Sequence, residues 1–173
     1  SNAAGTARLG PVGSGASYTG DLIVERYIPG GATNWRLIGS PVVGTTVLNW
    51  KDDFFTAGFP GSHYPNFYSG GQLWPSVRRY DETVGNADIN AGLIGVAGTG
   101  EALIAGRGYA AWSGDVLGGT APFTLDVKGN PNIAHSPLAL PVAWTDSGNP
   151  TADGWNLVSN PLPSPIDFEA IAL

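Results

Sequence analysis

The chain of 173 residues contains no cysteine and no methionine, and its histidines are only His63 and His135. The absence of cysteine excludes disulfide bonds, thiolate metal sites and cysteine nucleophiles together. No HExxH pattern, Gly-x-Ser-x-Gly elbow or Gly-Lys-Ser/Thr phosphate loop is present. With no motif for catalysis or nucleotide binding, we expect a protein that is not an enzyme and requires no cofactor.

Charged residues are also scarce, at 13% of the chain, and the net charge at pH 7 is −6. The eight Lys and Arg residues are scattered, and the pair Arg78-Arg79 is the nearest approach to a basic cluster. Binding to nucleic acid or to an anionic membrane depends on clustered positive charge, so neither partner is expected. No apolar run approaches the roughly 18 residues that span a bilayer, which predicts no membrane insertion.

Glycine and proline are abundant instead, with 26 and 14 residues, beside six residues each of Trp, Tyr and Phe. Turn-forming residues combined with enough aromatic residues to fill a core favour an all-β domain over a disordered chain. No window of 12 or more residues shows a helical period with caps, and one short helix is expected from Ser164. We predict an antiparallel β-sandwich, jelly-roll-like, with roughly nine strands.

The chain divides by composition into an N-terminal segment and one folded domain. Residues 1–20 are small and glycine-rich and begin with Ser-Asn-Ala, which indicates a tag remnant and a flexible linker. Residues 21–173 form the predicted β-sandwich domain. Strands are expected at 22–28, 35–43 with a break at Pro41, 76–80, 102–104, 108–112, 123–128, 138–144 and from 155 onward.

A short phrase occurs twice. Residues 35–41 read WRLIGSP, the first phrase, and residues 155–161 read WNLVSNP, the second phrase. Their spacing of about 120 residues is far longer than that of solenoid or propeller repeats. The two phrases are therefore expected to be two related strands that close one domain, or else the start of a second domain. Trp35 and Trp155 are expected in the core.

The segment 51–76 contains seven aromatic residues and little periodicity. Loops longer than about 12–15 residues are uncommon and tend to be functional or ordered by their own packing. One interpretation is that this loop folds over an open end of the sandwich and completes the core. The other interpretation is a sugar-binding site, because aromatic faces stack on the apolar face of a pyranose while polar groups form hydrogen bonds with its hydroxyls. The candidate ligand-binding residues are His63, Tyr64, Asn66, Tyr68, Gln72 and Trp74.

Acidic residues give weaker signals. Asp52 and Asp53 are adjacent and are weak candidates for calcium ligands. Ca²⁺ binds six to eight oxygen ligands, and the sequence has no spaced D-x-D-x-D-G loop. A glycosidase needs two carboxylates flanking the scissile bond. Fourteen acidic residues make some such pair inevitable in any fold, so their number decides nothing.

Residues 154–168 closely resemble the phrase GWNLVGNPYPSPIDW of large secreted Bacteroidota proteins, many of which carry a type IX secretion sorting domain. Two departures from that phrase stand out: Ser159, where glycine is usual, and Leu162, where tyrosine is usual. Further pieces that resemble the same proteins lie at 25–29, 35–41, 80–82, 106–109 and 121–124. The resemblance spans about residues 24–170 and implies a secreted or cell-surface module truncated from a larger protein.

The sequence thus predicts a non-catalytic structural or adhesive module of a large extracellular protein. Its partners would be polysaccharide, other surface proteins or neighbouring domains of the same parent chain. An alternative is a carbohydrate-binding module that uses the loop 51–76, and a weaker alternative is an enzyme acting on glycosides.

Overall fold

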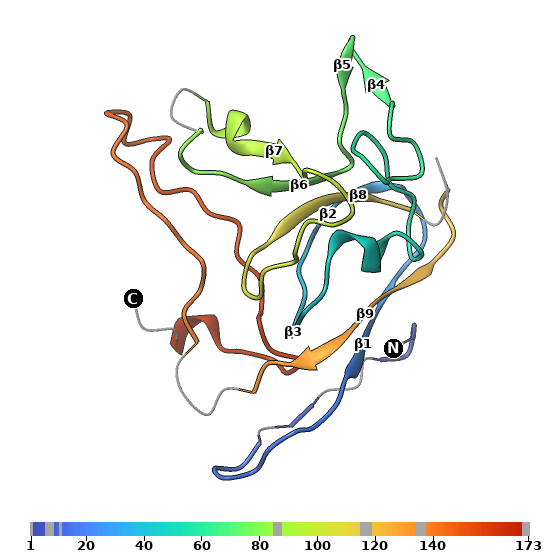
Figure 1. The fold of residues 1–173 in the computed structure, drawn as a ribbon, viewed down its shortest axis with the longest axis vertical. Helices are drawn as coiled ribbons and strands as arrows, with labels where there is room; N and C mark the ends of the chain where they lie inside the picture. The colour runs from blue at the N-terminus through green and yellow to red at the C-terminus, as the bar shows by residue number, and fades with distance from the viewer. Residues whose placement is uncertain are drawn as a thin grey trace.

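Alternating apolar and polar side chains build the longest strands, which assemble into antiparallel sheets (Figure 1). The computed structural model describes residues 2–5, 9–10, 12–84, 88–114, 119–133 and 138–170. One sheet contains, in spatial order, β1 (Leu22–Ile28), β9 (Phe123–Pro131) and β3 (Val42–Val43). The second contains β2 (Asn34–Ile38), β8 (Tyr109–Ser113), β6 (Val77–Tyr80) and β7 (Leu93–Gly95).

The remaining elements are short. Strands β4 (Tyr68–Ser69) and β5 (Gln72–Leu73) form a separate hairpin. The helical turns are of the 3-10 type and are η1 (Val47–Trp50), η2 (Ile89–Gly92) and η3 (Phe168–Ala170). Every strand pair is antiparallel, and the described residues contain no α-helix. The all-β, antiparallel prediction is confirmed.

Strand β9 shows how the pattern sets the core. Leu125 and Val127 are buried and Phe123 is half-buried on the same face, as the alternation predicts. The strand continues through Gly129 to Pro131, where the sequence suggested a turn. A Cβ at Gly129 would collide with the carbonyl oxygen of Val43, so this glycine permits close approach of β3 instead of a turn.

The break predicted at Pro41 is confirmed. Strand β2 ends at Ile38, and the chain then leaves the four-stranded sheet and enters the three-stranded sheet as β3. Buried Ser40 stabilises the crossing, because its hydroxyl donates to the carbonyl oxygen of Val42 (2.8 Å) and lies 3.0 Å from the hydroxyl of Thr45. The first phrase therefore connects the two sheets.

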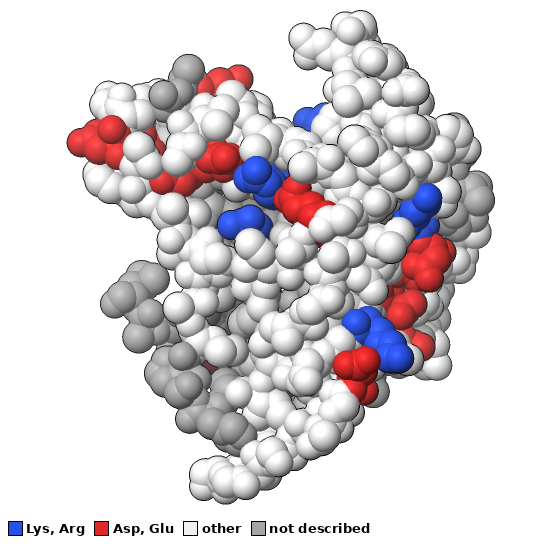
Figure 2. Space-filling model, in the orientation of Figure 1, with Lys and Arg blue, Asp and Glu red and all other residues white. Residues whose placement is uncertain are grey.

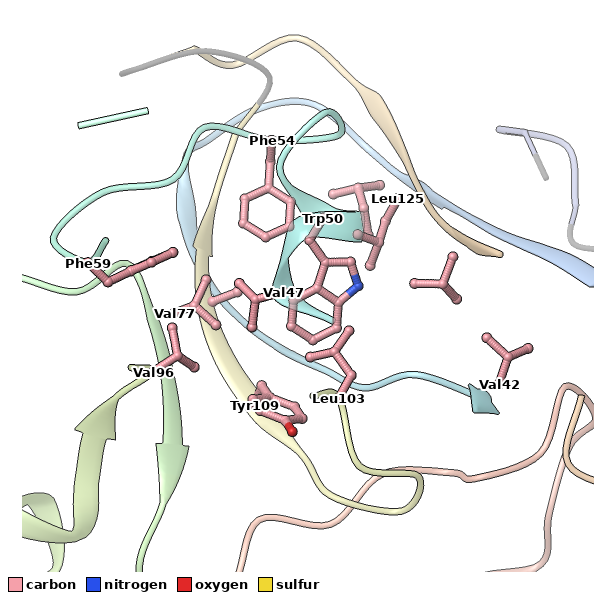
Figure 3. Close-up of a cluster of buried hydrophobic side chains, with 13 residues drawn as sticks. Val42, Val47, Trp50, Phe54, Phe59, Val77, Val96, Leu103, Tyr109 and Leu125 are labelled. Carbon is pink, nitrogen blue, oxygen red and sulfur yellow. The ribbon is translucent and has the colours of Figure 1, made fainter. Parts of the chain in front are cut away.

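The core receives side chains from both sheets and from η1, which lies between them (Figures 1 and 3). Trp50 is fully buried and its ring meets that of Tyr109 edge to face at a centroid distance of 5.4 Å. Phe54 and Phe59 of the loop 51–76 are also in this cluster, at 2% and 1% exposure. This half of the loop completes the core, as one of the two interpretations predicts.

Four expected elements differ from the structure. Residues 102–104 and 138–144 form no strand, and the second phrase makes only one isolated bridge, from Val158 to Arg107. Pro141 interrupts the segment 138–144 and cannot donate to a ladder. The helix expected from Ser164 is reduced to the 3-10 turn η3.

The two phrases nevertheless both pair with the segment that contains β8. Strand β2 pairs with β8 up to the pair Ile38–Tyr109. Just before β8 in the chain, Arg107 forms an isolated antiparallel bridge with Val158 of the second phrase. The amide of Gly108 donates to the carbonyl oxygen of residue 157 at 2.8 Å. The second phrase thus lies against the residues that precede β8, beside Gly39 of the first phrase.

Candidate functional site

The residues predicted from the loop 51–76 lie in different local settings. Tyr64 and Tyr68 are exposed, at 44% and 60%, and Asn66 is exposed as well. Tyr64 packs against the buried ring of Phe55 (6.0 Å between centroids), whereas Tyr68 and Gln72 lie on the β4–β5 hairpin. Sugar binding by this loop therefore remains a prediction that rests on individual exposed side chains.

Trp74 belongs to a packed cluster of tryptophans. Its ring lies 5.5 Å from that of Trp35 and 5.8 Å from that of Trp112, and Trp35 and Trp112 are direct cross-strand partners. The Arg78 guanidinium lies over Trp35 (5.0 Å) and Trp74 (5.8 Å). Burial lowers the pKa of Arg78 from its ordinary value. Because neighbouring rings and the guanidinium cover Trp74, the cluster is mainly structural.

His63 is tied to its own loop. Its Nδ1 accepts a hydrogen bond from the amide of Thr56 at 3.2 Å and lies 3.2 Å from the Thr56 hydroxyl. Burial, and secondarily the positive charge of Lys51, lower the pKa of His63. The side chain therefore acts as a neutral acceptor that fixes the loop.

Exposed tryptophans gather elsewhere, at a hollow lined by residues 142–144 and 153–156, which we call the tryptophan hollow. It has a volume of about 600 Å³. Trp144 is 68% exposed and Trp155 is 52% exposed. Exposed rings of this size are unfavourable in water, and two of them at one concave place indicate a binding surface.

Hydrogen bonds hold the two sides of the tryptophan hollow together. The Asn156 side chain accepts from the amide of Ala143 (3.1 Å) and donates to the carbonyl oxygens of Ala143 (2.8 Å) and Gly154 (3.0 Å). The indole of Trp155 donates to the carbonyl oxygen of Thr151 at 3.2 Å, which fixes its ring. The hollow is therefore preformed, which limits the entropy lost on binding.

The loop between the two tryptophans is anchored at both ends. Thr145 donates its hydroxyl to buried Glu82 at 2.6 Å, and Asp153 accepts hydrogen bonds from the amide and hydroxyl of Ser147. Gly154 has φ +72° and lies directly under the Trp144 ring, where a Cβ would collide with it. Glycine at this position thus allows the ring to rest on the backbone.

The prediction that Trp155 lies in the core is wrong, and Trp35 is also 37% exposed. Trp35 has ring partners across the sheet, whereas the second phrase pairs at Val158 only and leaves its tryptophan outside. The signal that could have located the hollow was the position of Trp144 and Trp155 on either side of a turn-rich segment.

The acidic candidates lie away from the hollow. Asp53 Oδ2 accepts a hydrogen bond from the amide of Asp126 at 2.8 Å. Burial, with repulsion from Asp126 and Asp52, raises the pKa of Asp53 to about 7. Within the described residues, no three Asp, Glu or His side chains are placed to hold a metal ion. The calcium prediction therefore gains no support.

Replacing Asp53 with asparagine should raise stability at pH 8, and should raise it by less than half as much at pH 5. The folded pKa of Asp53 lies above its unfolded value, so wild-type stability falls as pH rises from about 4 through about 7. Since Asp53 is partly solvated, we expect a gain in melting temperature of about 2–4 °C at pH 8. Thermal denaturation of both proteins at the two pH values measures it. An unchanged pH dependence in the variant would contradict this assignment.

Charge is sparse on the surface. Figure 2 shows Lys, Arg, Asp and Glu in a few small groups, with most of the visible face uncharged. Among the described residues, no helix is long and apolar enough to cross a membrane.

No family model, curated protein or solved structure matches the chain. Function is therefore inferred from the site itself.

Proposed function

We propose that this protein is a non-catalytic adhesive module that binds polysaccharide through the tryptophan hollow. The observation that carries the proposal is the pair of exposed indoles, Trp144 and Trp155, at a preformed concave surface. A pyranose offers an apolar C–H face to an indole and hydroxyls to neighbouring polar groups. The Asp153 carboxylate also lines the hollow and is an acceptor for such hydroxyls.

The same geometry favours binding over hydrolysis. Asp153 supplies the carboxylate of the hollow, and its Oδ1 is already engaged by Ser147. Glycoside hydrolysis uses a pair of carboxyl groups on either side of the bond that is cleaved. One carboxylate beside two stacking rings suits adhesion, which is why the enzymatic alternative ranks below it.

The finer fold and the location belong to the same proposal. A jelly-roll-like β-sandwich is supported by a core that both sheets share. A secreted or cell-surface location in a type IX secretion substrate is supported by the resemblance of residues 154–168 to Bacteroidota surface proteins. In such a parent chain, the module would attach neighbouring domains to polysaccharide or to other surface proteins.

Substitution of Trp144 or Trp155 by alanine should weaken binding to polysaccharide about tenfold or more. Each ring would supply a major share of the contact, as buried aromatic anchors do at interfaces. The measurement is a pull-down with insoluble cellulose, chitin, xylan and α-glucan, followed by titration with soluble oligosaccharides of the retained class. Binding to none of these by the wild-type protein would count against the proposal.

The matched control is Tyr68→Ala, which removes an aromatic ring of 60% exposure from the β4–β5 hairpin. It should leave the affinity within twofold. Loss of binding in Tyr68→Ala, with full binding in the two tryptophan variants, would show that the binding site is in the loop 51–76 and not in the tryptophan hollow. Melting temperatures near that of the wild type would show that each loss is local.

A further inference from the structure

A second hollow opens between the edges of the two sheets. It is a groove of about 690 Å³, within the usual range of small-molecule sites, and its walls come from β1, β2, β9 and the C-terminal segment. Apolar side chains dominate these walls, including Val24, Ile38, Val127, Leu162 and Phe168. The groove lies apart from the tryptophan hollow and shares no lining residue with it.

An arginine on the inner face of the sheet lines this apolar groove. Arg26 of β1 stands opposite buried Leu125 in the ladder, so its side chain shares the inner face with Val24 and Ile28. No hydrogen bond or ion pair joins Arg26 to another described residue. Arg26 is exposed, so its charge lies at the rim of the groove, where an anion could pair with it.

The other charges around the groove leave this positive charge uncompensated. The Arg36 guanidinium of β2 is held by the carbonyl oxygens of Ser113 (2.6 Å) and Ala32 (3.1 Å), with no carboxylate beside it among the described residues. Asp126 also borders the groove, but it pairs with residue 25 on the outer face of the sheet. The inner faces of β1 and β2 therefore carry two cations.

The floor of the groove holds an unused hydrogen-bond donor. Trp50 lines the groove, and its Nε1 is buried with no partner among the described residues. Figure 3 shows the ring nitrogen on the side of Val42, away from Phe59 and Val96. A buried N–H without an acceptor is costly, so a ligand oxygen that displaced the side chains covering Trp50 would satisfy it.

We propose that this groove binds an anionic amphiphile of the long-chain carboxylate class. The aliphatic chain would lie along Val24, Val127 and Leu162, and the carboxylate would pair with the Arg26 guanidinium. The Trp50 N–H supplies a further donor to an oxygen of the ligand. Apolar walls match the aliphatic chain of such a molecule, and the unpaired cation and the buried donor match its carboxylate.

The test is titration of the intact protein with dodecanoate, below its aggregation concentration, by calorimetry. We expect saturable binding of one molecule per chain. Arg26→Gln should weaken it about tenfold, because a charge-assisted hydrogen bond to the carboxylate is lost, and Trp50→Phe about threefold. Dodecanol should bind more weakly than dodecanoate to the wild type and equally to wild type and Arg26→Gln.

Lys128→Gln is the matched control, because it removes one positive charge from the exposed outer face of the same sheet. It should leave dodecanoate affinity within twofold. An equal loss in Arg26→Gln and Lys128→Gln would reduce the effect to net charge and overturn the site. So would the absence of saturable binding, or equal affinity of the wild type for dodecanol and dodecanoate. Melting temperatures of the variants monitor their folding.

Discussion

Replacement of Trp50 by alanine should destabilise the protein by about 3–5 kcal/mol, the usual cost of removing a fully buried tryptophan. Trp50 has no solvent exposure and packs against Tyr109 and Phe54 at centroid distances of 5.4 and 6.5 Å. It lies in η1, between the two sheets, so the cavity would open where both meet. The melting temperature should fall by roughly 10 °C, measured by circular dichroism.

The matched control is Trp144→Ala, which removes the same side chain from a position of 68% exposure. It should cost less than about 1 kcal/mol, because little of that ring is removed from water on folding. Comparable losses of stability in both variants would contradict the assignment of Trp50 as the centre of the core.

The second large effect should come from Gly58→Ala, at about 2–4 kcal/mol. Gly58 has φ +79°, a region that costs other residues about 1–2 kcal/mol, and a Cβ there would overlap the carbonyl group of Trp74. Moving that carbonyl would disturb the Trp74 ring and with it the contacts to Trp35 and Trp112. We expect a lower urea midpoint together with a change in the near-ultraviolet circular dichroism of the tryptophans.

Gly71→Ala separates the conformational cost of the positive φ from the cost of the collision with Trp74. Gly71 also has φ +79°, but nothing lies within 4 Å of a Cβ built there. Its variant should lose only the conformational part, about 1–2 kcal/mol, and keep the tryptophan spectrum. If Gly58→Ala lowered the free energy of unfolding no more than Gly71→Ala, the close approach of Gly58 to Trp74 would not contribute to stability.

Strands with a clear two-residue period could be predicted from the sequence. Strands β1, β6, β8 and β9 lie where the sequence predicted them. In β9 one face is buried and the other is half-buried or exposed, whereas β8 is buried on both faces as a central strand. The very short strands β3, β4, β5 and β7 carry too few residues to show a period. Their positions depend on pairing partners far away in the chain.

The candidate site was less predictable for a related reason. The second phrase resembles the first in sequence, yet only the first forms a paired strand, over residues 35–38. The environment of Trp155 is thus set by where the sheet edge ends, which local sequence does not encode. The groove beside Arg26 depends likewise on a cross-strand neighbour, Leu125, about 100 residues away.

The pairing of β1 with β9 also determines how quickly the domain is completed. Leu22 faces Gly129, so this ladder closes a loop of about 100 residues before its hydrogen bonds form. Topologies dominated by such distant contacts fold slowly, in milliseconds to seconds for small β-proteins. During synthesis, the β1 segment must wait for Phe123–Pro131 to emerge, and until then it remains an unpaired apolar strand that requires protection from aggregation.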